Sequence, residues 1–142
     1  MDILNTFRIS GSALQAQSTR LNTISSNLAN VETTSTPDGG PYKKKSVVFQ
    51  SSPLSFQEQL DGVSKGMQGV SVTKIAEDTN APRKVYNPAH PDAKEDGYVE
   101  MPNISVLEEM VDMMSATRSY QANVTSIKMA KRMAMKALEI GR

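Results

Sequence analysis

The chain has 142 residues with 16 basic and 15 acidic side chains, and its formal net charge of +1 at pH 7 favours neither nucleic acid nor an anionic membrane surface as a partner. It contains no Cys, which excludes disulfides, thiolate metal ligands and a Cys nucleophile. The length fits one domain, and four Tyr, three Phe and no Trp predict a core that is poor in aromatic side chains.

Neither a membrane-spanning segment nor a cleaved secretory signal is evident. No window holds the roughly 18 apolar residues that a spanning helix needs, and residues 1–5 (MDILN) lack a basic region followed by an apolar one. The sequence therefore predicts no direct membrane insertion. It is compatible with a cytoplasmic location or with export that uses no cleaved signal.

The first predicted element is a long helix over about residues 3–31. Its apolar residues recur at every seventh position and on an adjoining row: Phe7, Leu14, Leu21, Ile24 and Leu28. This spacing is typical of a helix that packs along another helix. At 1.5 Å per residue the helix is roughly 40 Å long.

The polar face of this helix carries very little charge. Asp2, Arg8 and Arg20 are the only charged residues among the first thirty, and the rest of the polar face is Ser, Thr, Asn and Gln. A solvated helix face normally carries many more Lys, Glu, Arg and Asp. We therefore expect this face to contact protein as well, through hydrogen bonds rather than ion pairs.

The middle of the chain predicts a small, irregular, β-rich insertion. Residues 33–41 are a dense run of turn formers. Three strands are expected, within residues 42–50, 70–73 and 97–101, and a fourth is possible. The prolines between them disfavour central strands. Gln50 to Gly69 is expected to hold one short helix or to be mobile, and Lys43–Lys45 is interpreted as a solvated strand edge rather than a basic binding patch.

Nothing in the sequence predicts catalysis. His90 is the only His, and one His with scattered carboxylates does not supply the three or four ligands of a metal site. A Gly-rich phosphate loop, a nucleophile elbow and a pair of carboxylates at catalytic spacing are not recognisable. We therefore expect no catalytic, cofactor-binding or metal-binding residues.

The last predicted element is a helix of roughly 35 residues that ends near Ile140. Ser105 with Glu108 three residues later forms a capping box at its start. Its seam positions alternate steps of three and four, with one interruption at Lys131: Val106, Met110, Met113, Thr117, Tyr120, Val124, Ile127, Ala134 and Leu138. Met110 and Met113 are interpreted as core-filling residues. The helix is acidic at its start and basic near its end, which suits the helix dipole and would favour stacking along an axis.

These elements predict a fold that is mainly α with a small β-rich insertion. The two long terminal helices should pack as a coiled-coil-like hairpin, with a middle region of short, irregular strands. The expected division is an N-terminal helix within residues 1–34, a middle region over 35–102 and a C-terminal helix within 103–142. A chain bracketed by two such helices is typical of a part that assembles with others.

Several segments resemble one protein family. Residues 21–30 (LNTISSNLAN) resemble the N-terminal signature of bacterial flagellar rod and hook proteins, and residues 115–123 (SATRSYQAN) resemble their C-terminal one. Residues 37–42, 85–91 and 96–103 are similar to the proximal-rod branch of that family. The resemblance spans nearly the whole chain in order, and residues 50–69 are its weakest part.

The resemblance implies a non-enzymatic, structural subunit of the proximal rod of the flagellar basal body. Such proteins cross the inner membrane unfolded through the flagellar type III export apparatus, assemble helically beneath the hook and transmit motor torque across the periplasm. The implied partners are copies of the chain itself and other rod proteins, with no nucleic acid and no small-molecule substrate. The terminal helices are expected to be poorly ordered in the monomer and to order on assembly.

Carried onto this sequence, the resemblance and the helical spacing predict subunit contacts on both terminal helices. On the first helix the expected residues are Phe7, Leu14, Leu21, Ile24, Asn27, Leu28 and Asn30. On the last helix they are Met110, Met113, Thr117, Tyr120, Gln121, Asn123, Val124 and Ile127. The amide and hydroxyl groups among them should specify register, because a slipped pairing leaves buried polar groups unsatisfied.

The alternative hypothesis is a cytoplasmic coiled-coil adaptor or chaperone. In that case the two terminal helices pair as a stable antiparallel hairpin, the chain forms a small oligomer and it is not exported. Detection of the chain in isolated hook–basal bodies separates the two hypotheses.

Overall fold

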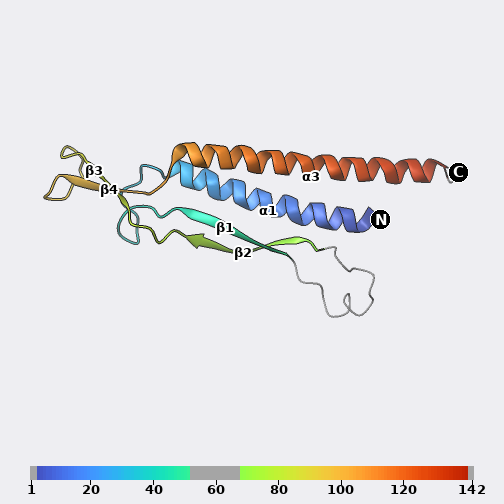
Figure 1. Cartoon of the computed structure of the whole chain (residues 1–142), viewed down its shortest axis with the longest axis horizontal. Helices are drawn as coiled ribbons and strands as arrows, with labels where there is room; N and C mark the ends of the chain where they lie inside the picture. Colours follow the sequence, from blue (N-terminus) through green and yellow to red (C-terminus); the bar gives the residue numbers. More distant parts are fainter. Residues whose placement is uncertain (1–2, 52–67, 141–142) are drawn as a thin grey trace.

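The computed structural model describes residues 3–51 and 68–140, and it forms a long, narrow molecule (Figure 1). Helix α1 (Ile3–Ala29) runs antiparallel to helix α3 (Val106–Ile140), and the hairpin of β1 (Lys45–Ser51) and β2 (Val70–Glu77) lies along the other side of α1. A second hairpin, β3 (Arg83–Tyr86) and β4 (Tyr98–Met101), lies at one end of the molecule. The predicted fold class, with two terminal helices around short antiparallel strands, is confirmed.

On the α3 side, the contact with α1 is made by small residues. Ala116 and Ala130 are buried there, and among the described helices and strands α3 contacts α1. Leu14, Leu21, Leu28 and Phe7 are only half-buried. Small residues let two helix backbones approach closely, at the lower end of the usual 8–10 Å separation. The heptads therefore correctly predict that the helices pair, but the buried alanines of α3, Ala116 and Ala130, lie outside the predicted stripe.

Helix α1 lies between α3 and the β1–β2 hairpin, so part of its uncharged polar face is covered within the chain. The Ser12 hydroxyl accepts a hydrogen bond from the Val70 backbone N–H at 3.1 Å, and the Ser26 hydroxyl lies 3.3 Å from that of Tyr42. The expectation that this face contacts protein is met on the hairpin side. Another row on the same helix stays exposed and holds Gly11, Gln15, Ser18, Asn22 and Ser25.

The β1–β2 pair is antiparallel, from Lys45 opposite Glu77 to Ser51 opposite Val70, with a register shift between Val48 and Phe49. A two-stranded hairpin is marginal in water by itself, and here it is supported by packing on α1. Strands were expected in both places, although β2 extends to Glu77. The expected helix or mobile segment between Gln50 and Gly69 falls mainly on residues 52–67, outside the described residues.

The β3–β4 hairpin pairs Arg83 with Met101 and Tyr86 with Tyr98. The prolines of this region disfavour a strand, yet β3 forms among them. Pro82 and Pro88 lie just outside β3, so they do not interrupt its hydrogen bonds. The rings of Tyr86 and Tyr98 meet edge to face, with centroids 5.3 Å apart. Gly97 has φ of 73°, and a Cβ there would lie 2.9 Å from the Tyr86 ring, so this turn requires glycine.

A small apolar core joins the second hairpin to the helices. Val99, Pro102 and Ile104 are buried there. Helix α3 starts directly after this core, where the Ser105 hydroxyl accepts the Glu108 backbone N–H at 3.4 Å, as expected for an N-cap. The β3–β4 hairpin, the loop before β1, the end of α1 and the start of α3 therefore meet in one region, which we call the junction. Neither α1 nor α3 is apolar enough over a sufficient length to cross a membrane.

Because Ala116 is buried where the two helices meet, we expect a larger side chain there to destabilise the fold. Changing Ala116 to Leu should lower the free energy of unfolding by about 1–3 kcal/mol, because the fully buried methyl group has no room to grow. The matched change of Ala122, which is exposed on the same helix, should be close to neutral. Urea unfolding followed by circular dichroism measures both, and equal effects at the two positions would contradict this packing.

Candidate assembly interface

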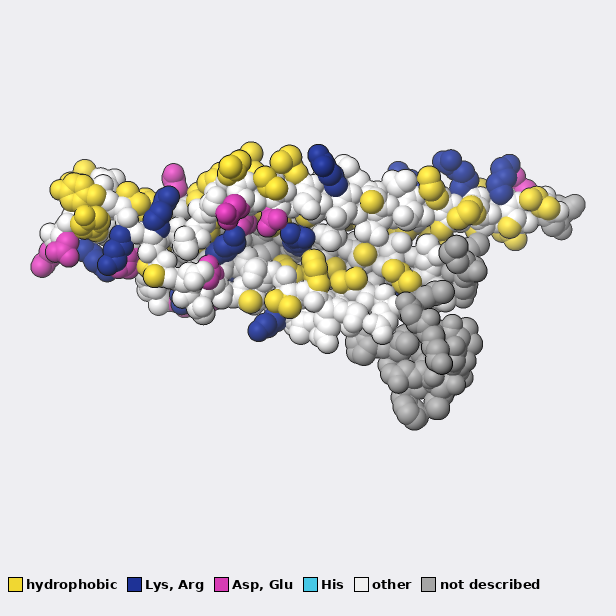
Figure 2. Space-filling model, viewed as in Figure 1, with side chains coloured by type: hydrophobic (Ala, Val, Ile, Leu, Met, Phe, Trp, Pro, Cys, Tyr) yellow, Lys and Arg dark blue, Asp and Glu magenta, His cyan; other side chains and the backbone are white. Residues whose placement is uncertain are grey.

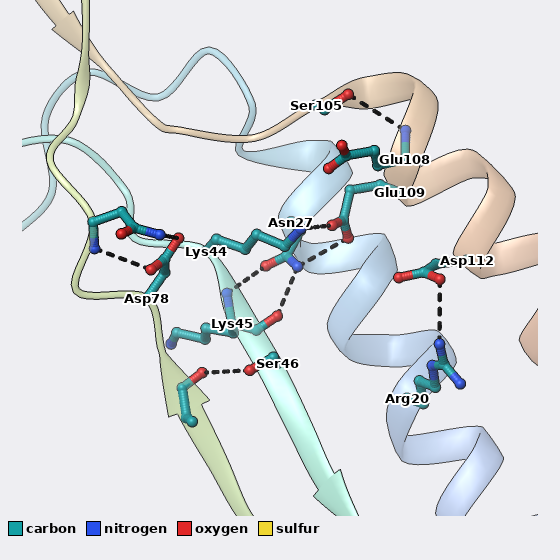
Figure 3. A network of polar contacts seen from close by, with 12 residues as sticks. Arg20, Asn27, Lys44, Lys45, Ser46, Asp78, Ser105, Glu108, Glu109 and Asp112 are labelled. Atoms are coloured by element: carbon teal, nitrogen blue, oxygen red, sulfur yellow. Dashed lines mark hydrogen bonds and ion pairs between the residues drawn. The ribbon is translucent and has the colours of Figure 1, made fainter.

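Asn27, near the end of α1, is the centre of the junction (Figure 3). Its side-chain amide donates to the backbone carbonyl of Lys45 at 2.8 Å and to Glu109 Oε2 at 3.0 Å. Its oxygen accepts from the backbone N–H of Lys45 at 2.9 Å and from the Tyr42 hydroxyl at 3.1 Å. Both donors and both acceptor positions are therefore used, and the side chain is only 1% exposed. One residue ties α1 to β1 and to α3.

Glu109, in the first turn of α3, is the acidic side of the junction. It is 1% exposed, and its Oε1 lies 2.7 Å from the Lys44 ammonium. The hydrogen bond to Glu109 raises the pKa of Lys44 above its ordinary value, against the opposing effect of partial burial. A buried carboxylate is stable only when its charge and lone pairs are satisfied. Lys44 supplies the charge here, and Asn27 supplies a second hydrogen bond.

A second ion pair joins the two helices one turn further along. Arg20 of α1 lies 3.3 Å from Asp112 of α3 (Figure 3). Two of the three acidic residues at the start of α3, Glu109 and Asp112, are thus paired within the chain, and Glu108 remains exposed. The acidic start of this helix is less available for contacts with other molecules than its sequence indicates.

The interpretation of Lys43–Lys45 as a solvated strand edge is wrong for Lys44. Lys43 is exposed as expected, whereas the Lys44 side chain is 27% exposed and reaches the buried Glu109. No local pattern predicts this pair, because its partners are more than sixty positions apart in sequence and meet only through the fold.

Many large apolar side chains of α3 are exposed in the part of the chain that the structure describes. Figure 2 shows hydrophobic side chains along the first turns of this helix and again near its last turns. The exposed large apolar residues of α3 are Val106, Leu107, Met110, Val111, Met114, Tyr120, Met129, Met133, Met135, Leu138 and Ile140. An open apolar groove among them is lined by Met110, Met113, Met114, Thr117 and Arg118. Exposed apolar surface of this kind is typical of an interaction site.

Two of the seven contact residues predicted on the first helix are buried within the chain, and the other five are half-buried. Ile24 and Asn27 are buried. Asn30 is half-buried, and its amide donates to the Ser26 carbonyl at 2.8 Å just past the helix end. The remaining four are half-buried beside the helix contact: Phe7, Leu14, Leu21 and Leu28.

The predicted contact residues of α3 divide into two groups. Met110, Tyr120 and Gln121 are exposed, so the expectation that Met110 fills the core is wrong. The others are half-buried: Met113, Thr117, Asn123, Val124 and Ile127. The Asn123 amide donates to the Ser119 carbonyl of its own helix at 2.9 Å. The apolar stripe that starts at Val106 therefore lies next to the contact with α1, and part of it remains exposed to solvent.

The described residues contain no group of three or more His, Cys, Asp or Glu side chains that could hold a metal ion. The contacts described above form a helix pair that is fixed at the junction, with one apolar face of α3 left open.

Comparison with known proteins identifies the family of this chain. The chain is 45% identical over 150 residues to the flagellar basal-body rod protein FlgC of Bacillus subtilis (strain 168), covering all of both chains. It is 46% identical to FlgC of Salmonella typhimurium (strain LT2), over 99% of each chain. FlgC of Borreliella burgdorferi is 40% identical, over 99% of this chain and 98% of its own. The chain belongs to the FlgC family of flagellar basal-body rod proteins.

Two family models match the two helical regions of this FlgC-family chain. Residues 7–35 match the model described as flagella basal body rod protein, and residues 95–140 match the model described as flagellar basal body rod FlgEFG protein C-terminal. These ranges cover α1 from Phe7 onward and all of α3, including the segments around Asn27 and Tyr120 that carry the resemblance. Family membership makes the chain a structural component of the flagellar basal-body rod and places it there.

The main residues that the sequence prediction missed are Glu109, Lys44 and Tyr42. Glu109 was assigned only to the helix dipole. The sequence contains a signal for the burial of Glu109. It shares one helix row, at a spacing of seven, with three uncharged residues: Ala116, Asn123 and Ala130. A charged residue in that register must find an internal partner. For Lys44 and Tyr42 the sequence offers no comparable signal.

The lysine run offers a matched pair of variants. Changing Lys44 to Ala should lower the free energy of unfolding by about 1–3 kcal/mol, because Glu109 loses its counter-charge, whereas Lys43 to Ala should be nearly silent. Since the folded-state pKa of Lys44 is raised, its contribution is fully present below the ordinary Lys value of 10.5 and is lost as pH rises through the higher folded value. Denaturant unfolding at neutral pH and above pH 10.5 tests both statements, and a similar loss for Lys43 to Ala would contradict them.

Proposed function

We propose that this chain is a structural subunit of the proximal rod, which the flagellar type III apparatus exports and which assembles helically to carry motor torque across the periplasm. The observation that carries this proposal is the open apolar face of α3 on a chain whose FlgC relatives align over essentially its whole length. A subunit that works alone gains nothing from such a face, whereas a subunit of a rod has it covered by neighbours.

The helix pair suits a load-bearing part. Asn27 and Glu109 lock α1, α3 and β1 together, and the ion pair of Arg20 with Asp112 adds a second connection. Buried, fully satisfied polar groups favour one register, because any slip leaves them without partners. We propose that the junction keeps each subunit in one shape under load. In this view Asn27 acts within the subunit.

The contacts between subunits are assigned to surfaces that the chain leaves open. Met110, Tyr120 and Gln121 are exposed, and Met113, Thr117, Val124 and Ile127 border them. The exposed uncharged row of α1, from Gly11 to Ser25, offers hydrogen-bonding groups to a second neighbour. The partners proposed are copies of the chain and other rod proteins, and the role is non-enzymatic.

Immunodetection in isolated hook–basal bodies tests the proposal. The chain should co-purify with the basal body from motile cells, and its deletion should leave cells without rod or filament. A chain confined to the cytoplasm as a small stable oligomer would overturn the proposal in favour of an adaptor or chaperone.

One variant separates assembly from folding. Changing Met110 to Asp should leave the free energy of unfolding within about 0.5 kcal/mol of the parent chain, because the side chain is half exposed in the subunit. The same change should abolish incorporation into the rod, since it places an unpaired charge in a packed interface. Circular dichroism and immunodetection in basal bodies measure the two effects. Normal motility with normal protein levels would show that Met110 lies outside the interface.

A further inference from the structure

Three side chains of the junction bring an amine, a carboxylate and a primary amide together. Glu109 lies between the other two: its Oε1 is 2.7 Å from the Lys44 ammonium, and its Oε2 accepts the Asn27 amide N–H at 3.0 Å. Asn27 and Glu109 are each 1% exposed. Figure 3 shows these side chains meeting from three different segments, α1, α3 and the chain just before β1. An amine and a primary amide that share one buried carboxylate are the reactants for the formation of a new amide bond.

The carbonyl group of Asn27 is held in a way that favours attack on its carbon. Its Oδ1 accepts a hydrogen bond from the backbone N–H of Lys45 at 2.9 Å and another from the Tyr42 hydroxyl at 3.1 Å. Two donors on one carbonyl oxygen stabilise the negative charge that develops there when a nucleophile adds to the carbon, as in an oxyanion hole. The contacts that bury Asn27 therefore also polarise its Cγ.

The carboxylate of Glu109 connects the nucleophile with the leaving group. One of its oxygens lies against the Lys44 ammonium and the other against Asn27 Nδ2, so it can accept a proton on one side and return it on the other. The ion pair is the resting state, because the hydrogen bond to Glu109 raises the pKa of Lys44. The free amine is a minor species, so the reaction is slow, and it follows folding because only folding brings the three groups together.

We propose that Lys44 forms an intramolecular isopeptide bond with Asn27, with Glu109 as the catalytic base and acid. Glu109 accepts a proton from the Lys44 ammonium, and Nζ forms a bond to Cγ of Asn27. Glu109 then gives that proton to Nδ2, the bond between Cγ and Nδ2 breaks, and ammonia leaves with the remaining excess proton as ammonium. An ammonium group and a primary amide become a secondary amide and ammonium, so no oxidant or reductant is needed.

The bond links the end of α1 covalently to the chain before β1. Asn27 and Lys44 are 17 positions apart, and closing a loop of this length restricts the unfolded chain as a disulfide does. The chain contains no Cys and so has no disulfide for this purpose. The proposal goes beyond the structural role in the rod and does not depend on it, because the three groups meet within one chain.

Mass spectrometry of the purified full chain tests the proposal. The chain is folded, as checked by circular dichroism, and incubated at neutral and at mildly alkaline pH, with samples taken for intact mass and for tryptic peptide mapping. The expected product has lost the mass of one ammonia. In the peptide map, residues 21–43 should be joined to Lys44–Lys45 through a link from Asn27 to Lys44.

Matched variants identify the reacting groups. Changing Lys44 to Arg keeps a cation beside Glu109 but removes the amine, so this variant should keep its full mass, whereas Lys43 to Arg should react like the parent chain. Changing Glu109 to Gln should slow the reaction by roughly 100-fold or more, since the proton carrier is lost. If the Gln variant does not fold, the comparison of the two Arg variants decides.

Four results overturn the proposal. They are an unchanged mass after prolonged incubation at both pH values, loss of ammonia without a cross-link (a cyclic imide at Asn27), a link from Lys43 or Lys45 instead, and loss of ammonia in the Lys44 to Arg variant. None of these results bears on the role in the rod, which immunodetection in basal bodies tests separately.

Discussion

Replacing Glu109 by Lys is expected to lower the free energy of unfolding by about 3–5 kcal/mol, the largest effect of any single change considered for this chain. The substitution removes the partner of Lys44 and places a second ammonium group at a position where Glu109 is only 1% exposed, and Asn27 loses an acceptor. Because domains of this size are stable by only about 5–15 kcal/mol, much of the folded population would be lost. The measurement is denaturant unfolding of the purified chain, with protein level and motility measured in cells.

Glu108 provides the control for this variant. It precedes Glu109 in the same first helical turn but is exposed, so Glu108 to Lys should change the free energy of unfolding by less than about 1 kcal/mol through the helix dipole alone. Similar losses for the two variants would show that the charge of the helix start, rather than the buried pair, determines the effect.

Replacing Asn27 by Ala is expected to lower the free energy of unfolding by about 3 kcal/mol, since several buried groups lose a partner at once. The backbone N–H and carbonyl of Lys45, the Tyr42 hydroxyl and Glu109 Oε2 all bond to this one amide. The loss of two bonds to β1 should also loosen the β1–β2 hairpin. Hydrogen exchange should therefore show faster exchange at Lys45 and along β1.

Asn22 is the matched control, because it lies in the same helix and is exposed. Its change to Ala removes a poor helix former and should be neutral or slightly stabilising. Unchanged exchange rates along β1 in the Asn27 variant would contradict the role of Asn27 as the connection between helix and hairpin.

Much of the fold follows from local patterns in the sequence. The heptad spacing of Phe7, Leu14, Leu21 and Leu28 predicts a long first helix, and the three-four steps from Val106 predict the last one. Both helices are present close to the expected limits, as Ile3–Ala29 and Val106–Ile140. These patterns succeed because a helix of such length depends on side chains near in sequence.

The prediction of the contacting faces was less successful, and the reason is physical. An apolar stripe shows that a helix side avoids water, but it does not tell whether the cover comes from the same chain or from a neighbour. Met110 was expected in the core and is exposed, whereas Ala116 and Ala130 form the buried contact. Alanine is a weak signal in a hydrophobic pattern, although its small size is what allows the helices to approach.

From the sequence by itself, the two long helices, the turn-rich insertion and a role in assembly could be predicted. The family signatures around Asn27 and Tyr120 could also be recognised there. The tertiary structure alone decided that Lys44 meets Glu109, that Asn27 joins three elements, and that the outward side of α3 is open. The two groups of features differ in how far apart in the sequence the interacting residues lie. Helical periodicity and turn chemistry are encoded within a few residues, whereas a buried charge pair depends on segments that only folding brings together.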